Sequence, residues 1–81
     1  MIVTVLYFAQ ARERAGRSSE TIEVADHVRL DAALAAIRAA RPELVPLWEH
    51  LAIAVDGVLA PGDAVLRAGA EIALLPPVSG G

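Results

Sequence analysis

The sequence predicts an α+β fold, in which one mixed β-sheet is covered on one face by one main helix. Two observations lead to this class: short runs rich in β-branched and apolar residues occur at both ends of the chain, and a longer run between them has helical periodicity. A chain of 81 residues is expected to form one domain. We therefore assign residues 1–81 to a single domain, with 76–81 as a protruding C-terminal tail.

The first half of the sheet is expected near the N-terminus. IVTVLYF at 2–8 is short and rich in β-branched and aromatic residues, which predicts a strand. Nearly every position is apolar, so we expect both faces to be covered, as in a central strand. AQARERAG at 9–16 favours a short helix that stops at Gly16. ETIEVA at 20–25 alternates polar and apolar residues, which indicates a half-buried strand.

The main helix is predicted over LDAALAAIRAAR, residues 30–41. Apolar residues recur there at i, i+4 and i+7, which places them on one face: Leu30, Leu34 and Ile37. Pro42 cannot continue the helix and disfavours helical geometry at the residue before it. Residues 42–50 contain two prolines, and we expect either a loop or a short turn of helix there.

The remaining strands follow this segment. Asp56-Gly57 between apolar runs predicts a type I′ hairpin, because both central residues of that turn need positive φ. We predict strands over residues 51–55, 58–60 and 71–75.

Charge and composition exclude several classes of protein. The net charge is −3 and no lysine is present, which argues against nucleic-acid binding. Arg12, Arg14 and Arg17 cluster, but Glu13 interrupts them, so we interpret the cluster as a solvated face. No cysteine, signal-peptide pattern or membrane-length apolar run occurs. We expect a cytoplasmic protein without membrane contact.

The sequence offers little catalytic chemistry. His27 and His50 have no partners at metal-ligand spacing, and no glycine-rich phosphate loop is present. The serines have no base at a recognisable spacing. We therefore expect no metal and no cofactor bound by this chain, and no active site of its own. Trp48 is interpreted as a packing or interface aromatic.

The closing residues PPVSGG suit a working chain end. Pro76 and Pro77 have fixed φ and no backbone donor, so they favour a stiff, extended exit from the last strand. Gly80 and Gly81 have no Cβ and can pass through a narrow channel. The pattern favours delivery of a terminal carboxylate into another protein's active site. A carboxylate is a poor electrophile, so a partner with ATP would have to activate it, for example as an acyl adenylate.

LYFAQARERAG near the start and ALLPPVSGG at the end together resemble the small subunit of molybdopterin synthase, a family of ubiquitin-like β-grasp sulfur carriers. The resemblance covers the whole chain. It implies that a ubiquitin-activating-like adenylyltransferase adenylates Gly81 with ATP and that the terminus becomes a thiocarboxylate. The tail would then donate sulfur to cyclic pyranopterin monophosphate in the active site of the large subunit. Two small and two large subunits would form a heterotetramer.

The resemblance also implies roles for individual residues. Gly80 and Gly81 would be the working end, and the residues expected to contact partners are Phe8, Leu75, Pro76, Pro77, Val78 and Ser79. Phe8 and Leu75 match the family's apolar docking patch, with core burial as the alternative reading.

The chain departs from the family pattern at the hairpin, where Asp56-Gly57 replaces the frequent Asn-Gly and suits the turn equally, and in two further places. Ala68-Gly69-Ala70 replaces Asp-Gly-Asp, which would weaken or alter contact with the activating enzyme. Arg29 stands where the main helix usually opens on Ser or Thr, so Asp31 is expected to cap the helix or favour its first turn.

Other functions remain open on the sequence alone. A sulfur carrier for thiamine or cysteine synthesis, a ubiquitin-like protein modifier, and an interaction module with an inert tail are the alternatives. Without lysine, a modifier could not build side-chain-linked polymers of itself.

Overall fold

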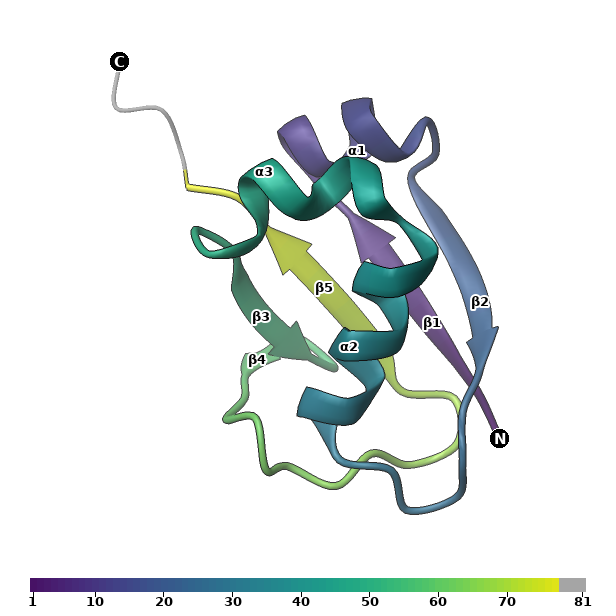
Figure 1. Ribbon diagram of the computed structural model, residues 1–81. Coiled ribbons are helices and arrows are strands. Elements are labelled where there is room, and N and C mark those ends of the chain that lie inside the picture. Colours follow the sequence, from purple (N-terminus) through teal and green to yellow (C-terminus); the bar gives the residue numbers. More distant parts are fainter. Residues whose placement is uncertain (78–81) are drawn as a thin grey trace.

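The computed structural model describes residues 1–77, and within them the elements alternate between strands and helices (Figure 1). In chain order they are β1 (Ile2–Tyr7), α1 (Ala9–Ala15), β2 (Ser19–Glu23), α2 (Leu30–Ala40), the 3₁₀ turn η1 (Pro42–Leu44), α3 (Val45–Trp48), β3 (Ala52–Val55), β4 (Val58–Leu59) and β5 (Glu71–Leu75). The elements predicted from the sequence are therefore all present, and 42–50 contains short helical turns.

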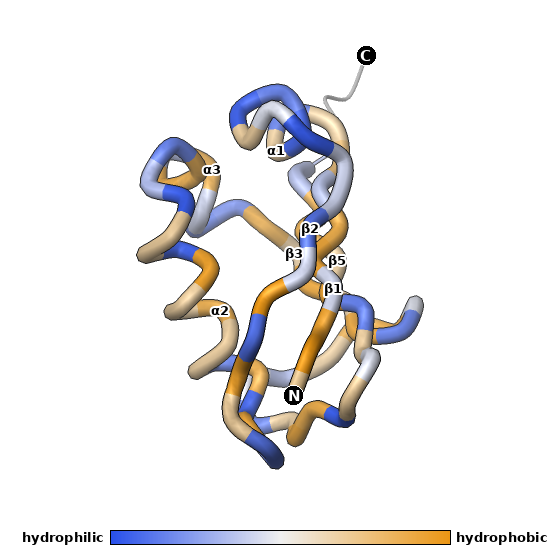
Figure 2. The backbone as a smooth tube through the Cα atoms, turned by 90° about the vertical axis from the view of Figure 1, so that its right-hand side faces the viewer, coloured by the Kyte–Doolittle hydropathy of each residue, from blue (hydrophilic) through white to orange (hydrophobic). Residues whose placement is uncertain are grey.

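The strands form one mixed sheet in the order β2-β1-β5-β3-β4. The central pair, β1 and β5, is parallel, whereas every other neighbouring pair is antiparallel. α2 crosses one face of this sheet, and Figure 2 shows α2 and α3 on the same side of it. This arrangement confirms the predicted α+β class and is the β-grasp fold that the resemblance implied.

The core lies between α2 and the facing side of the sheet. Strand pairing places Val5 opposite Ile72 and Tyr7 opposite Leu74, so these side chains share one face. All four are at most 2% exposed, and the helix contributes buried Leu30 and Ile37. The face predicted for α2 from its apolar periodicity is therefore the face that packs.

The second face of β1 differs from the prediction that both faces are covered. Ile2 is 50% exposed, and Thr4 and Leu6 are only half-buried. Residues 1–77 place helices over one side of the sheet only, so no second layer covers these side chains. An apolar strand run requires burial, but it does not reveal whether the chain itself provides it.

The end of β1 also comes one residue earlier than predicted. Phe8 has extended backbone angles but is the N-cap of α1, and Ala9 has a positive φ of 47°. This left-handed conformation is uncommon for alanine and turns the chain sharply into the helix. Gly16, with φ 72°, ends α1 as predicted.

The start of α2 is stabilised mainly by the loop that precedes β5. Arg29, its N-cap residue, makes no side-chain capping hydrogen bond. The first two backbone N–H groups of the helix instead donate to the carbonyl oxygens of Ala64 and Gly62, at 2.7 and 2.8 Å. Asp31 accepts a hydrogen bond from the N–H of Ala32 at 2.8 Å, which confirms its predicted support of the first turn.

The β3–β4 hairpin has the predicted turn. Asp56 and Gly57 have φ values of 51° and 84°, as a type I′ turn requires. The Oδ1 atom of Asp56 also accepts a hydrogen bond from the Glu71 N–H at 2.9 Å. The aspartate therefore shapes the turn and ties it to the first residue of β5.

Candidate functional site

The candidate site begins where β5 ends. Leu75 is the last residue of the strand and pairs with Ala52, after which Pro76 is half-buried and Pro77 is exposed. Neither proline has an N–H to extend the ladder. The sheet therefore ends directly before the tail, as predicted. The predicted partner-contacting Val78 and Ser79, and the working end Gly80 and Gly81, lie outside the described residues.

Phe8 and Leu75 emerge at the same end of the sheet. β1 and β5 are parallel, and Tyr7 pairs with Leu74, so the residues that follow this pair are at the same level. Figure 1 shows both arrowheads at the end from which the tail leaves. Phe8 is 45% exposed and Leu75 is half-buried, so the core-burial reading of Phe8 is wrong.

Leu75 and Phe8 both belong to the sheet face that α2 does not cover. Side chains alternate along a strand, and Leu74 occupies the helix-covered face, so Leu75 points to the other side. The same alternation carries Phe8 to the face of Leu6. Pairing adds the neighbouring strands, giving an open-face patch of Leu6, Phe8, Leu59, Ala73 and Leu75, in which the small Ala73 is only 9% exposed.

Leu59 is the member of the open-face patch that sequence reasoning missed. It is 69% exposed on the two-residue strand β4 and pairs with Ala54. A run of two residues is too short to show alternation. The predicted turn at Asp56-Gly57 fixes the register of the hairpin, so it pairs Val55 with Val58 and Ala54 with Leu59. Following this pairing from the turn could have placed Leu59 on this face.

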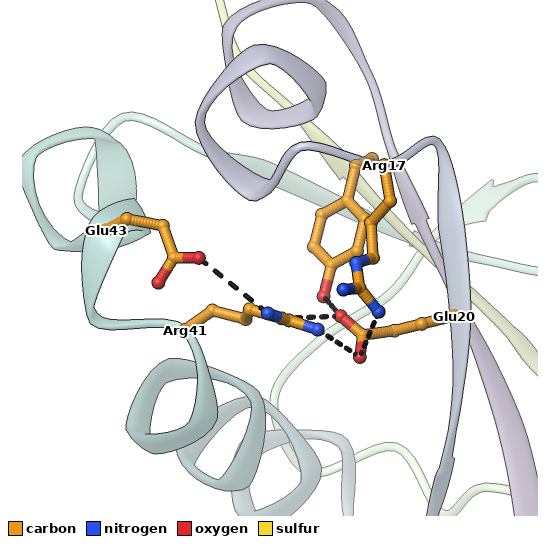
Figure 3. Close-up of polar contacts among 5 residues, drawn as sticks. Arg17, Glu20, Arg41 and Glu43 are labelled. Carbon is orange, nitrogen blue, oxygen red and sulfur yellow. Dashed lines mark hydrogen bonds and ion pairs between the residues drawn. The ribbon is translucent and has the colours of Figure 1, made fainter.

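A polar cluster lies at the same end of the molecule on the helix-covered side (Figure 3). Arg41, directly after α2, donates two hydrogen bonds of 2.7 Å to the carboxylate of Glu20 on β2. The hydroxyl group of buried Tyr7 donates to the same carboxylate. Arg17 lies 3.6 Å from Glu20, and Glu43 lies 3.8 Å from Arg41.

These contacts change the acidity of the cluster. The hydrogen bonds from Arg41 are the main reason that the pKa of Glu20 falls from 4.5 to about 2. Burial, followed by the hydrogen bond to Glu20, raises the pKa of the Tyr7 hydroxyl above its ordinary value. The cluster thus holds an ionised Glu20 between the end of β1 and the end of α2. Arg17 is partly exposed and contacts Glu20, which is consistent with the prediction that the arginine cluster forms a solvated face.

Replacing Glu20 with Gln is expected to lower the free energy of unfolding by about 1–2 kcal/mol at pH 7, because hydrogen bonds to a charged, partly exposed group are lost. The folded-state pKa lies below the ordinary one, so this stabilisation is present above pH 4.5 and disappears as the pH falls toward 2. Urea unfolding across this range measures it. The variant should lose less stability on acidification than the wild type. Glu23→Gln, on the exposed side of β2, is the matched control, and equal acid slopes for wild type and Glu20→Gln would contradict the account.

Trp48 packs beside α2, and both histidines lie at the surface. Trp48 is half-buried against the core and lines a groove of about 650 Å³ beside α2, which confirms its packing role. His27 and His50 are exposed, and among residues 1–77 no three potential metal-ligating side chains gather. None of the helices formed by those residues is long and apolar enough to span a membrane. The expectations of no metal and no cofactor stay predictions.

Ala68-Gly69-Ala70, which replaces two acids of the resembling family, has a structural role in this chain. Ala70 is buried in the core, and Gly69, with φ 81°, donates its N–H to the Ile2 carbonyl at 2.8 Å. Ala68 is exposed. Of the two positions where the resemblance leads us to expect an aspartate, it is therefore the one at the surface.

Comparison with known proteins gives consistent matches over the full chain. The pattern of the ThiS family matches residues 5–81. A molybdopterin synthase sulfur carrier subunit from Chlamydomonas reinhardtii is 39% identical, with 100% of both chains covered. One from Homo sapiens is 38% identical and covers 98% of this chain and 93% of its own.

Solved structures share the fold. The crystal structure of SAMP1 from Haloferax volcanii superposes with a TM-score of 0.90 at 29% identity, covering 100% of both chains. A chain in the protein–protein complex of subunits 1 and 2 of the molybdopterin-converting factor from Helicobacter pylori has a TM-score of 0.76 at 29% identity, again with 100% of both chains covered.

Proposed function

The chain belongs to the ThiS family, and from this membership we propose that it is the sulfur carrier subunit of a molybdopterin synthase. The full-length similarity to two such subunits is the observation that supports the proposal most strongly. The exit of the tail beside an open apolar face supports it independently, because a carrier must dock and present its terminus in one orientation.

The proposed chemistry takes place at the carboxylate of Gly81. Its oxygen attacks the α-phosphate of ATP on an adenylyltransferase, which forms an acyl adenylate and releases pyrophosphate. Hydrosulfide then attacks the acyl carbon and AMP leaves, which gives the thiocarboxylate without any change of oxidation state. In the synthase, this sulfur bonds to a carbon of cyclic pyranopterin monophosphate while a carbon–oxygen bond at that carbon breaks and the oxygen leaves. Water then cleaves the acyl–sulfur bond and restores the carboxylate.

In this proposal the chain presents sulfur and the large subunit provides the active site. The open-face patch is assigned to docking against the large subunit, because exposed apolar surface of this kind is typical of interfaces. The Helicobacter pylori complex joins subunits 1 and 2 of a molybdopterin-converting factor, and the 2+2 heterotetramer is proposed by analogy with the family. Cytoplasmic placement follows from the same proposal.

A protein-modifier function is the second candidate. The supporting observation is the TM-score of 0.90 to SAMP1, and a small archaeal modifier protein 1 from Methanosarcina acetivorans superposes with a TM-score of 0.80. In a modifier, the activated Gly81 would acylate lysines of other proteins. The higher sequence identity to sulfur carrier subunits, 38–39% against 26–29%, favours the carrier.

One incubation separates the candidates. The chain is mixed with its activating enzyme, ATP and a sulfur source, and intact masses are recorded before and after addition of a lysate. A carrier gains the mass of sulfur minus that of oxygen and stays unconjugated. Appearance of the chain on other proteins, without the sulfur mass, would reject the carrier in favour of the modifier. No change at all would reject both.

Replacing Pro76 and Pro77 together with Gly is expected to weaken binding of the large subunit. The glycines widen the conformational ensemble of the free tail, and ordering it costs up to about 1–2 kcal/mol per residue. If ordering the glycine-containing tail costs about 1.4 kcal/mol more, the affinity should fall on the order of tenfold. Calorimetric titration measures the affinity, and single-turnover kinetics at saturating large subunit measure sulfur transfer from the complex.

The rate of that transfer should change little, because the carboxylate itself is untouched. Unchanged affinity together with an unchanged transfer rate would show that the prolines serve only to end the strand. Unchanged affinity with slower transfer would assign them to positioning of the thiocarboxylate.

A further inference from the structure

The chain has few groups that an acyl adenylate could acylate. Lysine and cysteine are both absent from the 81 residues, and all seven cationic side chains are arginines. A guanidinium stays protonated at cellular pH and is not a useful nucleophile. The hydroxyl of Tyr7 is buried and donates to Glu20, and acyl groups on imidazole, as on His27 or His50, return to the carboxylate by hydrolysis. Among these 81 residues, the primary amine is the α-amino group of Met1.

The fold holds that amino group in place. The Met1 ammonium donates a hydrogen bond of 2.7 Å to the carbonyl oxygen of Val24 and lies 3.4 Å from Oδ1 of Asp26. The Val24 N–H donates back to the Met1 carbonyl at 2.9 Å, and the Met1 side chain is 8% exposed. An amine must be deprotonated with its lone pair free before it can attack. The Met1 amine would have to leave both partners first.

Distance separates the same amine from the tail of its own molecule. Leu75 is level with the residue after Tyr7, and Met1 lies seven residues back along β1, about 23 Å at the rise of a strand. Six residues extend at most about 20–22 Å. Even fully extended back along the sheet, the terminus of one copy falls short of its own amino group, so a second copy approaches that group more readily.

From these observations we propose that the chain is built to be a poor acceptor for its own activated terminus. The excluded step is attack of a primary amine on the acyl carbon of Gly81: an amide bond forms, the bond to the AMP oxygen breaks, and the amine proton passes to solvent. With that step suppressed, the acyl group is preserved for the nucleophile that a partner presents. The inference rests on the proposed function for its adenylate, but the state of the Met1 amine is independent of it.

The test incubates the untagged chain with activating enzyme and ATP, without a sulfur donor, and records intact masses. The wild type should form adenylate, measured by pyrophosphate exchange, yet only a low level of covalent dimer. Two variants restore an acceptor: Arg38→Lys on the exposed side of α2, and an N-terminal Gly-Ser-Gly extension that moves the amine away from Val24. Both should yield on the order of tenfold more self-conjugate than the wild type. Wild-type dimers at the level of the variants would overturn the inference.

An enzyme-free arm keeps the inference separate from the proposed function. The N-hydroxysuccinimide ester of acetate acylates amines without ATP. Acetylation of the wild-type amine should be on the order of tenfold slower than that of the extended chain. Equal acetylation rates for the wild type and the extended chain would show that the Met1 amine is not protected, whether or not adenylate forms. Absence of pyrophosphate exchange together with slow acetylation would reject the proposed function and leave the inference standing.

Discussion

Deletion of Gly81 is expected to abolish sulfur transfer completely and to leave the free energy of unfolding unchanged. The proposed chemistry needs the terminal carboxylate in the active site of the large subunit, and the length of Gly80 and Gly81 together is what places it there. Shortening the chain by one residue withdraws that carboxylate by about 3.3–3.6 Å. Misplacement of a reacting group by even about 1 Å can cost about 100-fold in rate. The last strand ends at Leu75, so stability should not depend on the last residue of the chain.

A synthase assay with purified large subunit and a urea unfolding curve test both parts. Gly62→Ala is the matched control: it changes a glycine whose added Cβ meets only the Asp31 side chain at ordinary contact distance, 3.5 Å. That variant should transfer sulfur normally. Turnover by the truncated chain would remove the basis for the carrier function.

Leu75→Glu is expected to weaken binding of the large subunit by roughly 100-fold, about 2.7 kcal/mol. Full burial of a leucine side chain contributes about 1.5–3 kcal/mol, and a carboxylate buried without a partner adds a penalty. The fold should be affected less, because Leu75 lies on the uncovered face and is already half-exposed to water. Titration calorimetry gives the affinity, and a melting curve gives the stability of the variant.

Val65→Glu is the matched control for this substitution. It adds the same charge at an exposed valine in the loop before β5, away from the open-face patch, and should bind the large subunit normally. Equal affinity for Leu75→Glu and the wild type would refute the docking role. Unfolding of Leu75→Glu would place Leu75 in the core, and Leu59→Glu on β4 would then test the same patch.

Local signals predicted the elements of this fold well. The i, i+4, i+7 pattern of α2, the Asp56-Gly57 turn and the stop at Gly16 each depend on neighbouring residues, and the structure has them all. The strand ends were less exact, because the pattern 2–8 continues through Phe8, whereas the chain turns at Ala9.

Contacts between distant residues could not be predicted in the same way. The Tyr7–Glu20–Arg41 cluster joins positions 13 and 21 residues apart in the sequence. Pairing of β1 with β2 brings Tyr7 and Glu20 together, and the end of α2 brings Arg41 to them. The open face of the sheet is a similar case. Its apolar residues look like core residues in sequence, and they differ in that residues 1–77 supply no second layer over them.

Sulfur tracing from the terminus tests the central claim most directly. The thiocarboxylate form of the chain is prepared with isotopically labelled sulfur and purified. It is mixed with the large subunit and with half as many molecules of cyclic pyranopterin monophosphate, because a dithiolene needs two sulfur atoms and each chain carries one. We expect the label to move into the dithiolene of the product, and the chain to return to its original carboxylate mass. Label retained on the chain, while unlabelled product forms, would contradict it.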